Sequence, residues 1–142
     1  MYLFDTDILS NIVKRNPSQT LLEKLRKLPK ERQYTSSINI GEIYYGANRS
    51  NRKDQIIGAF EERVFPNVHI IGFDGASGKL FGELKATLEK QGVVCSEPDL
   101  RIASIAIQHD FILITGNTKH FQRIPGLSIE NWIGTDRIES RN

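Results

Sequence analysis

The sequence predicts an α/β fold in which a mainly parallel sheet is covered by helices on both faces. Short apolar runs alternate with longer segments that carry apolar residues at helical spacing. The runs are apolar along most of their length, as expected of strands that are buried on both faces. The chain has 142 residues, 39% of them hydrophobic and 25% charged, which suits one globular domain.

The N-terminal half is expected to begin with a buried strand over residues 2–4, an apolar run that ends at Asp5. Asp7 and Ser18 are the expected N-caps of the next two helices, because short polar side chains accept hydrogen bonds from free backbone N–H groups. The elements expected over this half are helix 7–14, helix 18–28, strand 34–36, helix 38–48 and helix 53–64.

The C-terminal half repeats this alternation. Residues 99–109 are so apolar that we expect a helix buried on most sides, and residues 111–115 (FILIT) should form a strand. The remaining expected elements are strand 68–71, helix 75–91, a short strand or extended segment at 93–95, and a last strand at 129–133. The domain should therefore span residues 1–133, followed by a polar, flexible tail over residues 134–142.

Composition argues against several classes of protein. The single cysteine, Cys95, allows neither an internal disulfide framework nor a CxxC metal site. No apolar run approaches the roughly 18 residues of a membrane-spanning helix, and the N-terminus lacks the basic leader of a signal peptide. We therefore expect a cytoplasmic domain without a membrane partner.

Positive charge is concentrated in the first third of the chain. Residues 1–53 hold ten Lys and Arg against five Asp and Glu, whereas residues 54–100 hold four against eight. A basic region attracts RNA, because cationic side chains release counterions from phosphates, but a solvated helix face explains the same pattern. The expected contacts with an RNA backbone are Arg15, Arg49, Arg52 and Lys53.

Acidic and amide side chains follow the predicted strands. Asp5 comes directly after the first strand, Asp99 opens the apolar helix, and Asn117 follows the FILIT strand. Glu42 lies within a predicted helix. Ligands of open parallel sheets bind beyond the carboxyl ends of the strands. Carboxylates gathered there repel one another, and a divalent cation relieves that repulsion; oxygen ligands favour Mg²⁺ or Mn²⁺.

Four segments resemble, in order, the motifs of PIN-domain ribonucleases, and most closely those of the VapC-type toxins of bacterial toxin–antitoxin pairs. They are FDTDILS (4–10), SINIGEIYYGA (37–47), EPDLRIASIAI (97–107) and ITGNTKHFQRIPGLSIENW (114–132). The resemblance covers nearly the whole chain. It implies a three-layer α/β/α PIN-like domain that cleaves RNA.

This resemblance assigns roles residue by residue. The first acidic ligand of the family falls on Asp5, the helix-borne glutamate on Glu42 and the third acidic position on Asp99. The fourth position, often aspartate in the family, is Asn117, which supplies a neutral oxygen and one negative charge fewer. The residues expected to support these four are Thr115, Asp7 and, as a compensating carboxylate of our own inference, Glu97.

The implied reaction needs no protein nucleophile. Mg²⁺ held by Asp5, Asp99 and Glu42 would bind a phosphate oxygen and a water, and Glu42 or Asp99 would position that water or accept its proton. The implied products carry a 5′-phosphate and a 3′-hydroxyl. The implied partners are RNA, a small cognate antitoxin and a second copy of the chain. The apolar surface expected to serve the protein contacts comes from Ile12, Val13, Leu21 and Leu25.

The sequence leaves two other functions open. The run FDTD (4–7) also resembles the DxD opening of haloacid-dehalogenase phosphatases, in which the first aspartate attacks phosphate. Against this, Leu9 stands where that family has Thr or Val, and Glu42 would have no role. The other alternative is a non-catalytic RNA- or protein-binding module. Asn117 permits it, and the retained carboxylates argue against it.

Overall fold

The structure, a computed structural model, describes residues 1–134 and contains a five-stranded sheet in which all neighbouring strands are parallel. The spatial order of the strands is β3-β2-β1-β4-β5. The strands are β1 (Tyr2–Phe4), β2 (Gln33–Ser36), β3 (His69–Ile71), β4 (Ile112–Ile114) and β5 (Ser128–Glu130). The predicted α/β class with a parallel central sheet is therefore confirmed.

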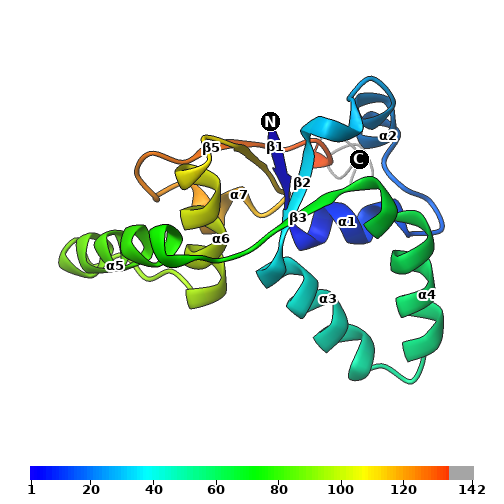
Figure 1. Ribbon diagram of the computed structural model, residues 1–142, viewed down its shortest axis with the longest axis horizontal. Coiled ribbons are helices and arrows are strands. Elements are labelled where there is room, and N and C mark those ends of the chain that lie inside the picture. The colour runs from blue at the N-terminus through cyan, green and yellow to red at the C-terminus, as the bar shows by residue number, and fades with distance from the viewer. Residues whose placement is uncertain (135–142) are drawn as a thin grey trace, which may run out of the picture.

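Helices lie on both sides of this sheet, with α1 to α4 on one side and α5 to α7 on the other (Figure 1). The chain adds β2 and β3 on one side of β1 and then returns to add β4 and β5 on the other. Because crossovers between parallel strands are right-handed, this reversal moves the later helices to the opposite face. The helices are α1 (Thr6–Ile12), α2 (Gln19–Arg26), α3 (Ser37–Asn48), α4 (Lys53–Arg63), α5 (Gly75–Lys90), α6 (Glu97–Gln108) and α7 (Thr118–Phe121).

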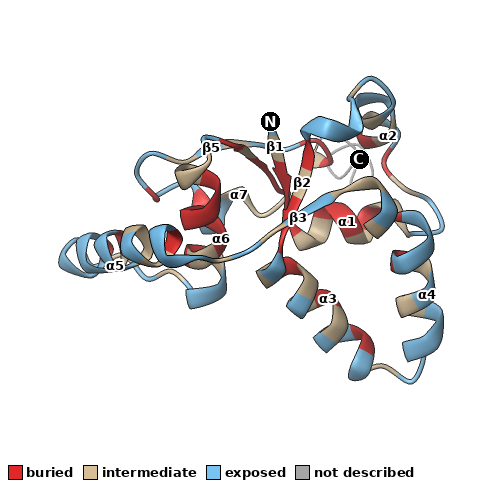
Figure 2. Ribbon diagram, in the orientation of Figure 1, coloured by how far each residue is buried: buried red, intermediate tan, exposed pale blue. Residues whose placement is uncertain are grey.

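Successive residues of the central strands serve different cores. Leu3 and Leu113 pack in the cluster that α5 and α6 supply, whereas Phe4 and Ile114 pack in the cluster on the α1 and α4 side. All four side chains are fully buried, and Figure 2 shows the buried residues concentrated along the sheet. Each such side chain contributes about 1.5–3 kcal/mol when it leaves water. Two cores therefore hold strands of only three or four residues in place.

The first helix begins earlier than predicted. Asp5 is the N-cap of α1, since its backbone is extended and its carboxylate accepts a hydrogen bond from the backbone N–H of Thr6. The N-cap role predicted for Asp7 is wrong, because the helix starts as soon as β1 ends and Asp7 already lies in the first turn. The helix also ends at Ile12 rather than near Lys14.

For residues 93–95, predicted as a short strand or an extended segment, the structure excludes the strand. Two other expectations in the C-terminal half need correction. Ser96 caps α6, so this helix starts at Glu97 and Asp99 lies within its first turn. The last strand ends at Glu130, because the next residues turn inward and bury Trp132 and Ile133 in the core on the α1 side.

The other predicted elements are present, with small shifts at their ends. Ser18 caps α2 as predicted, by accepting a hydrogen bond from the backbone N–H of Leu21. Of the predicted tail, only Gly134 belongs to the described residues. Within residues 1–134, none of the helices has the length and apolar character needed to cross a membrane.

Candidate active site

The carboxyl ends of β1 and β4 lie side by side at the point where the sheet changes its direction of growth. Asp5 follows β1, Thr115 follows β4, and β2 leads directly into α3. At such a switch point the connections from the two strands turn to opposite faces and leave a crevice between them. This topology brings the predicted site residues together.

Asp5 is fixed by three donors. It is only 5% exposed. One carboxylate oxygen, Oδ1, accepts from the backbone N–H of Thr6 at 2.8 Å and from Asn39 Nδ2 at 3.0 Å. The other, Oδ2, accepts from the Thr115 hydroxyl at 2.8 Å. These bonds set the orientation of the carboxylate before any ligand arrives.

Glu42 joins this group through a threonine hydroxyl. The Thr6 hydroxyl donates to Glu42 Oε1 at 2.8 Å and accepts from Asn39 Nδ2 at 3.0 Å. Asn39 and Glu42 are three residues apart on α3 and therefore face the same way. Thr6 and Asn39 were not among the site residues predicted from the sequence. The spacing Ser36–Asn39, which resembles a capping box, was the available signal for Asn39.

Asp99 approaches the same crevice from the first turn of α6. Its charge raises the pKa of Glu42, which places the two carboxylates within electrostatic range. Its Oδ2 lies 3.4 Å from Nδ1 of His120, a residue of α7. Of the acidic positions named from the sequence, Asp5 and Glu42 thus share one hydrogen-bond network, and Asp99 lies within electrostatic range of Glu42.

Burial and like charge act together on these carboxyl groups. Burial, with smaller contributions from the charges of Asp7 and Glu42, raises the pKa of Asp5 from 3.8 to about 6, although the bonds from Thr115 and Thr6 oppose the shift. Burial raises the pKa of Glu42 as well, and Asp99 adds to the effect. The group resists holding its full negative charge without a cation.

The oxygen atoms of this group suit a hard divalent cation. Within residues 1–134, no three Asp, Glu, His or Cys side chains converge into a ready-made metal cage. Mg²⁺ does not require one, because it keeps several waters and is usually held by one or two carboxylates and by substrate phosphates. Repulsion among the carboxylates is the strain that such a cation relieves. Asp5, Glu42 and Asp99 therefore fit a metal of this kind.

The loop after β4 closes onto the first helix. Asp7 Oδ2 accepts from the backbone N–H of Gly116 at 2.8 Å. A side chain at Gly116 would collide there, since its Cβ would lie 2.7 Å from Asp7 Oδ2 and 2.8 Å from Ile133 Cδ1. The next residue, Asn117, donates its backbone N–H to the Thr115 hydroxyl at 3.0 Å. Asp7 and Thr115 thus hold the loop after β4 close to Asp5 and α1, and Asn117 follows in the same loop.

Glu97 does not supply a further carboxylate to this group. Its Oε1 lies 3.2 Å from Lys85 Nζ of α5 and 3.9 Å from Arg101 of its own helix. The side chain is half exposed and faces α5. The reason is the start of α6: Glu97 is its first residue, whereas Asp99 lies two positions further round the turn.

The predicted RNA contacts lie apart from the acidic crevice. Arg52 precedes α4 and Lys53 is its first residue, next to the end of α3 that points away from the sheet (Figure 1). Arg49 stacks on the ring of Tyr45 in the same region, and Arg15 is exposed after α1. Among the apolar residues expected on the surface, Leu21 is fully buried and is therefore part of the core.

Comparisons with known proteins assign the chain to a family. Residues 2–127 match the PIN domain family. Ribonuclease VapC2 of Haemophilus influenzae is 33% identical over 132 residues, which cover 93% of this chain and 98% of that protein. The tRNA(fMet)-specific endonuclease VapC of Shigella flexneri is 28% identical, over 92% of this chain and 97% of its own.

A solved complex has the same fold. VapBC2 from Rickettsia felis, bound to a DNA fragment from its promoter, contains a chain with a TM-score of 0.85 and 33% identity. The match covers 92% of the present chain and 98% of that one. Sequence and fold thus agree over nearly the full length, and the chain belongs to the PIN-domain family and, within it, to the VapC ribonucleases.

Proposed function

We propose that this protein is a divalent-metal-dependent endoribonuclease that acts as the toxin of a toxin–antitoxin pair. The observation that carries the proposal is the group formed by Asp5, Glu42 and Asp99 at the switch point of the sheet. Its oxygen-only donors, in a chain similar to VapC ribonucleases over nearly its whole length, suit hydrolysis of a phosphodiester bond. The domain that carries this activity is proposed to span residues 1–133 and to work in the cytoplasm, where its RNA substrate is found.

Each residue has a distinct part in the proposed reaction. Bound Mg²⁺ or Mn²⁺ would supply charge stabilisation at the phosphate and a more acidic water. Asp5 is held rigidly by Thr6, Asn39 and Thr115 and so keeps a ligand oxygen in one position. Asp99, whose charge acts on Glu42, is proposed as the second anionic ligand.

Glu42 is proposed as the group that accepts the proton of the attacking water. Its raised pKa favours proton uptake, and the hydrogen bond from the Thr6 hydroxyl fixes Oε1. The water oxygen bonds to phosphorus while the bond from phosphorus to the 3′ oxygen breaks. The departing 3′ oxygen takes a proton from solvent, so the products carry a 5′-phosphate and a 3′-hydroxyl. Asn117 would orient the substrate from the edge of the crevice through its amide.

The test is cleavage of total RNA by the purified chain, followed by sequencing of the new ends. Because the Shigella relative is a tRNA(fMet)-specific endonuclease, initiator tRNA is the first RNA to inspect for cuts. We expect discrete cuts with Mg²⁺, none with chelator, and at least a 100-fold loss in Asp5→Asn and Asp99→Asn, since each removes a charged ligand.

Asp110→Asn is the matched control for these variants. Asp110 is exposed, lies at the opposite end of the sheet, before β4, and has a positive φ that Asn also tolerates. The Asp110→Asn variant should cleave RNA at the same rate as the unmodified chain. Cuts of equal strength in Asp5→Asn would refute the assignment.

No observation in the structure favours either alternative function. In the phosphatase alternative Asp7 has a catalytic role, whereas here its Oδ2 binds the backbone of Gly116. Glu42, which that alternative leaves without a role, is part of the hydrogen-bond network. A non-catalytic module would show no binding of Mg²⁺ or Mn²⁺ by calorimetry, and we expect binding that Asp5→Asn removes.

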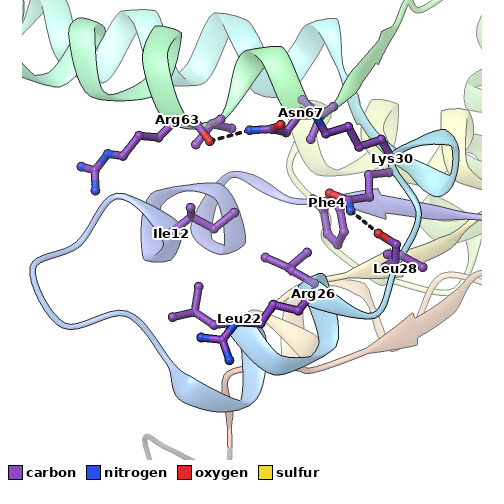
Figure 3. Close-up of a pocket in the computed structure, with 12 residues that line it drawn as sticks. Phe4, Ile12, Leu22, Arg26, Leu28, Lys30, Arg63 and Asn67 are labelled. Carbon is purple, nitrogen blue, oxygen red and sulfur yellow. Dashed lines mark hydrogen bonds between the residues drawn. The ribbon is translucent and has the colours of Figure 1, made fainter.

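The antitoxin is proposed to bind a groove between α1, α2 and α4. This groove has a volume of about 390 Å³. Its floor is apolar, with Phe4, Ile12 and Leu22, while Arg26 and Arg63 stand at its rim (Figure 3). A helix with one apolar face and flanking acidic residues matches this pattern. Structures similar to this chain are VapBC complexes, which supports a protein partner here.

Charge reversal at the rim tests the groove. Arg26→Glu combined with Arg63→Glu should weaken binding of the cognate antitoxin at least tenfold in calorimetry while RNA cleavage continues. Unchanged antitoxin affinity would exclude this groove. The second proposed partner is another copy of the chain. Light scattering of the isolated protein should give the mass of a dimer, and a monomer mass would exclude it.

A further inference from the structure

A second cavity adjoins the acidic crevice on the α7 side. It has a volume of about 280 Å³ and lies between the loop before α6 and the α7 region. Asp99 lines this cavity and also belongs to the acidic crevice. His120 lines the cavity as well and has its Nδ1 3.4 Å from Asp99 Oδ2. The cavity therefore opens directly beside the proposed point of cleavage.

Two cationic side chains at this cavity have no acidic partner among the described residues. Lys119 and Arg123 line the cavity and are exposed. In the part of the chain that the structure describes, neither forms an ion pair with a carboxylate. The acidic crevice repels phosphate until a cation binds, whereas these two residues attract it. The charges thus favour a phosphate group that enters next to the crevice.

Part of the cavity lining is apolar. It is formed by Val93 and Val94, and the side chain of Val94 is 97% exposed. An apolar side chain in full contact with water gains free energy when a flat apolar group covers it. A nucleobase has such a face, and the imidazole of His120 offers a second surface for stacking.

We propose that this cavity binds the unpaired nucleotide that flanks the scissile phosphate, with its phosphate against Lys119 and Arg123 and its base against Val93 and Val94. The inference rests on the proposed ribonuclease function and adds a substrate subsite to it. The volume is just below the roughly 300–1,000 Å³ of sites for drug-sized ligands, which suits one nucleotide.

Binding of a short single-stranded RNA by fluorescence anisotropy, in chelator, tests the subsite without cleavage. Lys119→Ala combined with Arg123→Ala should weaken binding about tenfold and lower the slope of log affinity against log salt by about one. In the cleavage assay this variant should raise KM more than it lowers kcat. Val94→Asp should also weaken binding, and because Val94 is exposed this change leaves the fold intact.

The matched control is Lys79→Ala combined with Lys90→Ala. Both lysines are exposed on α5 and do not line the cavity, so the net charge changes equally while the subsite remains. Its RNA affinity and salt slope should equal those of the unmodified chain.

The outcomes separate the two proposals. If the unmodified chain neither binds nor cleaves RNA, both fail. If it cleaves RNA and the Lys119 and Arg123 variant behaves like the control, only the subsite fails. If that variant loses affinity for the antitoxin but binds and cleaves RNA normally, the cavity is a protein contact and the subsite proposal is wrong.

Discussion

At the residue scale, two opposing effects act on the Asp5 carboxylate. It is buried beside other carboxylates, which raise its pKa, yet three hydrogen-bond donors hold its oxygens. Asn satisfies the same geometry, because its Oδ1 accepts from Thr6 and Asn39 and its amide can donate to the Thr115 hydroxyl. Asp5→Asn therefore removes the charge and keeps the packing.

This substitution predicts a pH-dependent gain in stability. The pKa of Asp5 is about 6 in the folded chain and 3.8 ordinarily, so between these values the folded state binds a proton that the unfolded state lacks. The contribution of Asp5 to the free energy of unfolding is complete below pH 4 and is lost as the pH rises through 6. In chelator, Asp5→Asn should therefore gain about 2 kcal/mol over the unmodified chain between pH 4.5 and 7.5.

Urea unfolding at the two pH values measures this difference. Asp110→Asn is again the control. Its free energy of unfolding should equal that of the unmodified chain at both pH values. Parallel curves for Asp5→Asn and the unmodified chain would contradict the raised pKa. Adding Mg²⁺ at pH 7.5 should stabilise the unmodified chain and leave Asp5→Asn unchanged, since a ligand stabilises only the state that binds it.

At the scale of elements, the start of α3 connects folding to the site. Ser36 and Asn39 form a reciprocal cap, in which the Ser36 side chain accepts from the N–H of Asn39 and Asn39 Oδ1 accepts from the N–H of Ser36. The same Asn39 side chain donates to Asp5 and Thr6 through Nδ2. One buried amide thus ends β2, begins α3 and orients the carboxylate after β1.

Asn39→Ala should therefore affect both stability and metal affinity. Loss of a cap and of buried hydrogen bonds predicts a decrease of about 2–3 kcal/mol in the free energy of unfolding. Calorimetry should show weaker Mg²⁺ binding, because Asp5 loses a donor that orients it. Asn48→Ala, at the exposed end of the same helix, should change stability by less than about 0.5 kcal/mol. Equal changes in stability and in Mg²⁺ affinity for Asn39→Ala and Asn48→Ala would contradict the proposed role of Asn39.

The elements differ in how far the sequence could predict them. Long helices such as α5 repeat their apolar residues often enough to define a period, and Ser18 marks the start of α2. The four residues of α7 are too few for any period to be visible. The cap of α1 was misplaced because both Asp5 and Asp7 can cap a helix, and the position of β1 in the sheet decides between them.

At the scale of the whole molecule, the C-terminal segment completes the core on the α1 side. Trp132 packs against Phe4 with ring centroids 5.8 Å apart and against Tyr2 at 5.3 Å. Ile133 is buried beside them, and its side chain leaves no room for a Cβ at Gly116. The last strand is followed directly by residues that the fold requires, which supports a domain boundary close to residue 133.

Shortening the chain tests this boundary. A chain that ends at Gly134 should keep the free energy of unfolding within about 0.5 kcal/mol and retain RNA cleavage. Trp132→Ala in the full chain should instead lose about 3–5 kcal/mol, because a large aromatic side chain leaves a cavity in the core. Thermal unfolding of both proteins measures this. A large loss on shortening would place the boundary further toward the C-terminus.

The sequence by itself determined the parallel α/β class and the residues with the chemistry for a metal site, because apolar period and residue type are local properties. It named Asp5, Glu42 and Asp99, but it could not show that Asn39 and Thr6 join the first two, nor that Glu97 faces Lys85. It also left the cavity beside His120 unseen. Those features depend on which strand ends lie next to each other and on how far each helix has turned at a given residue, and only the packed tertiary structure sets both.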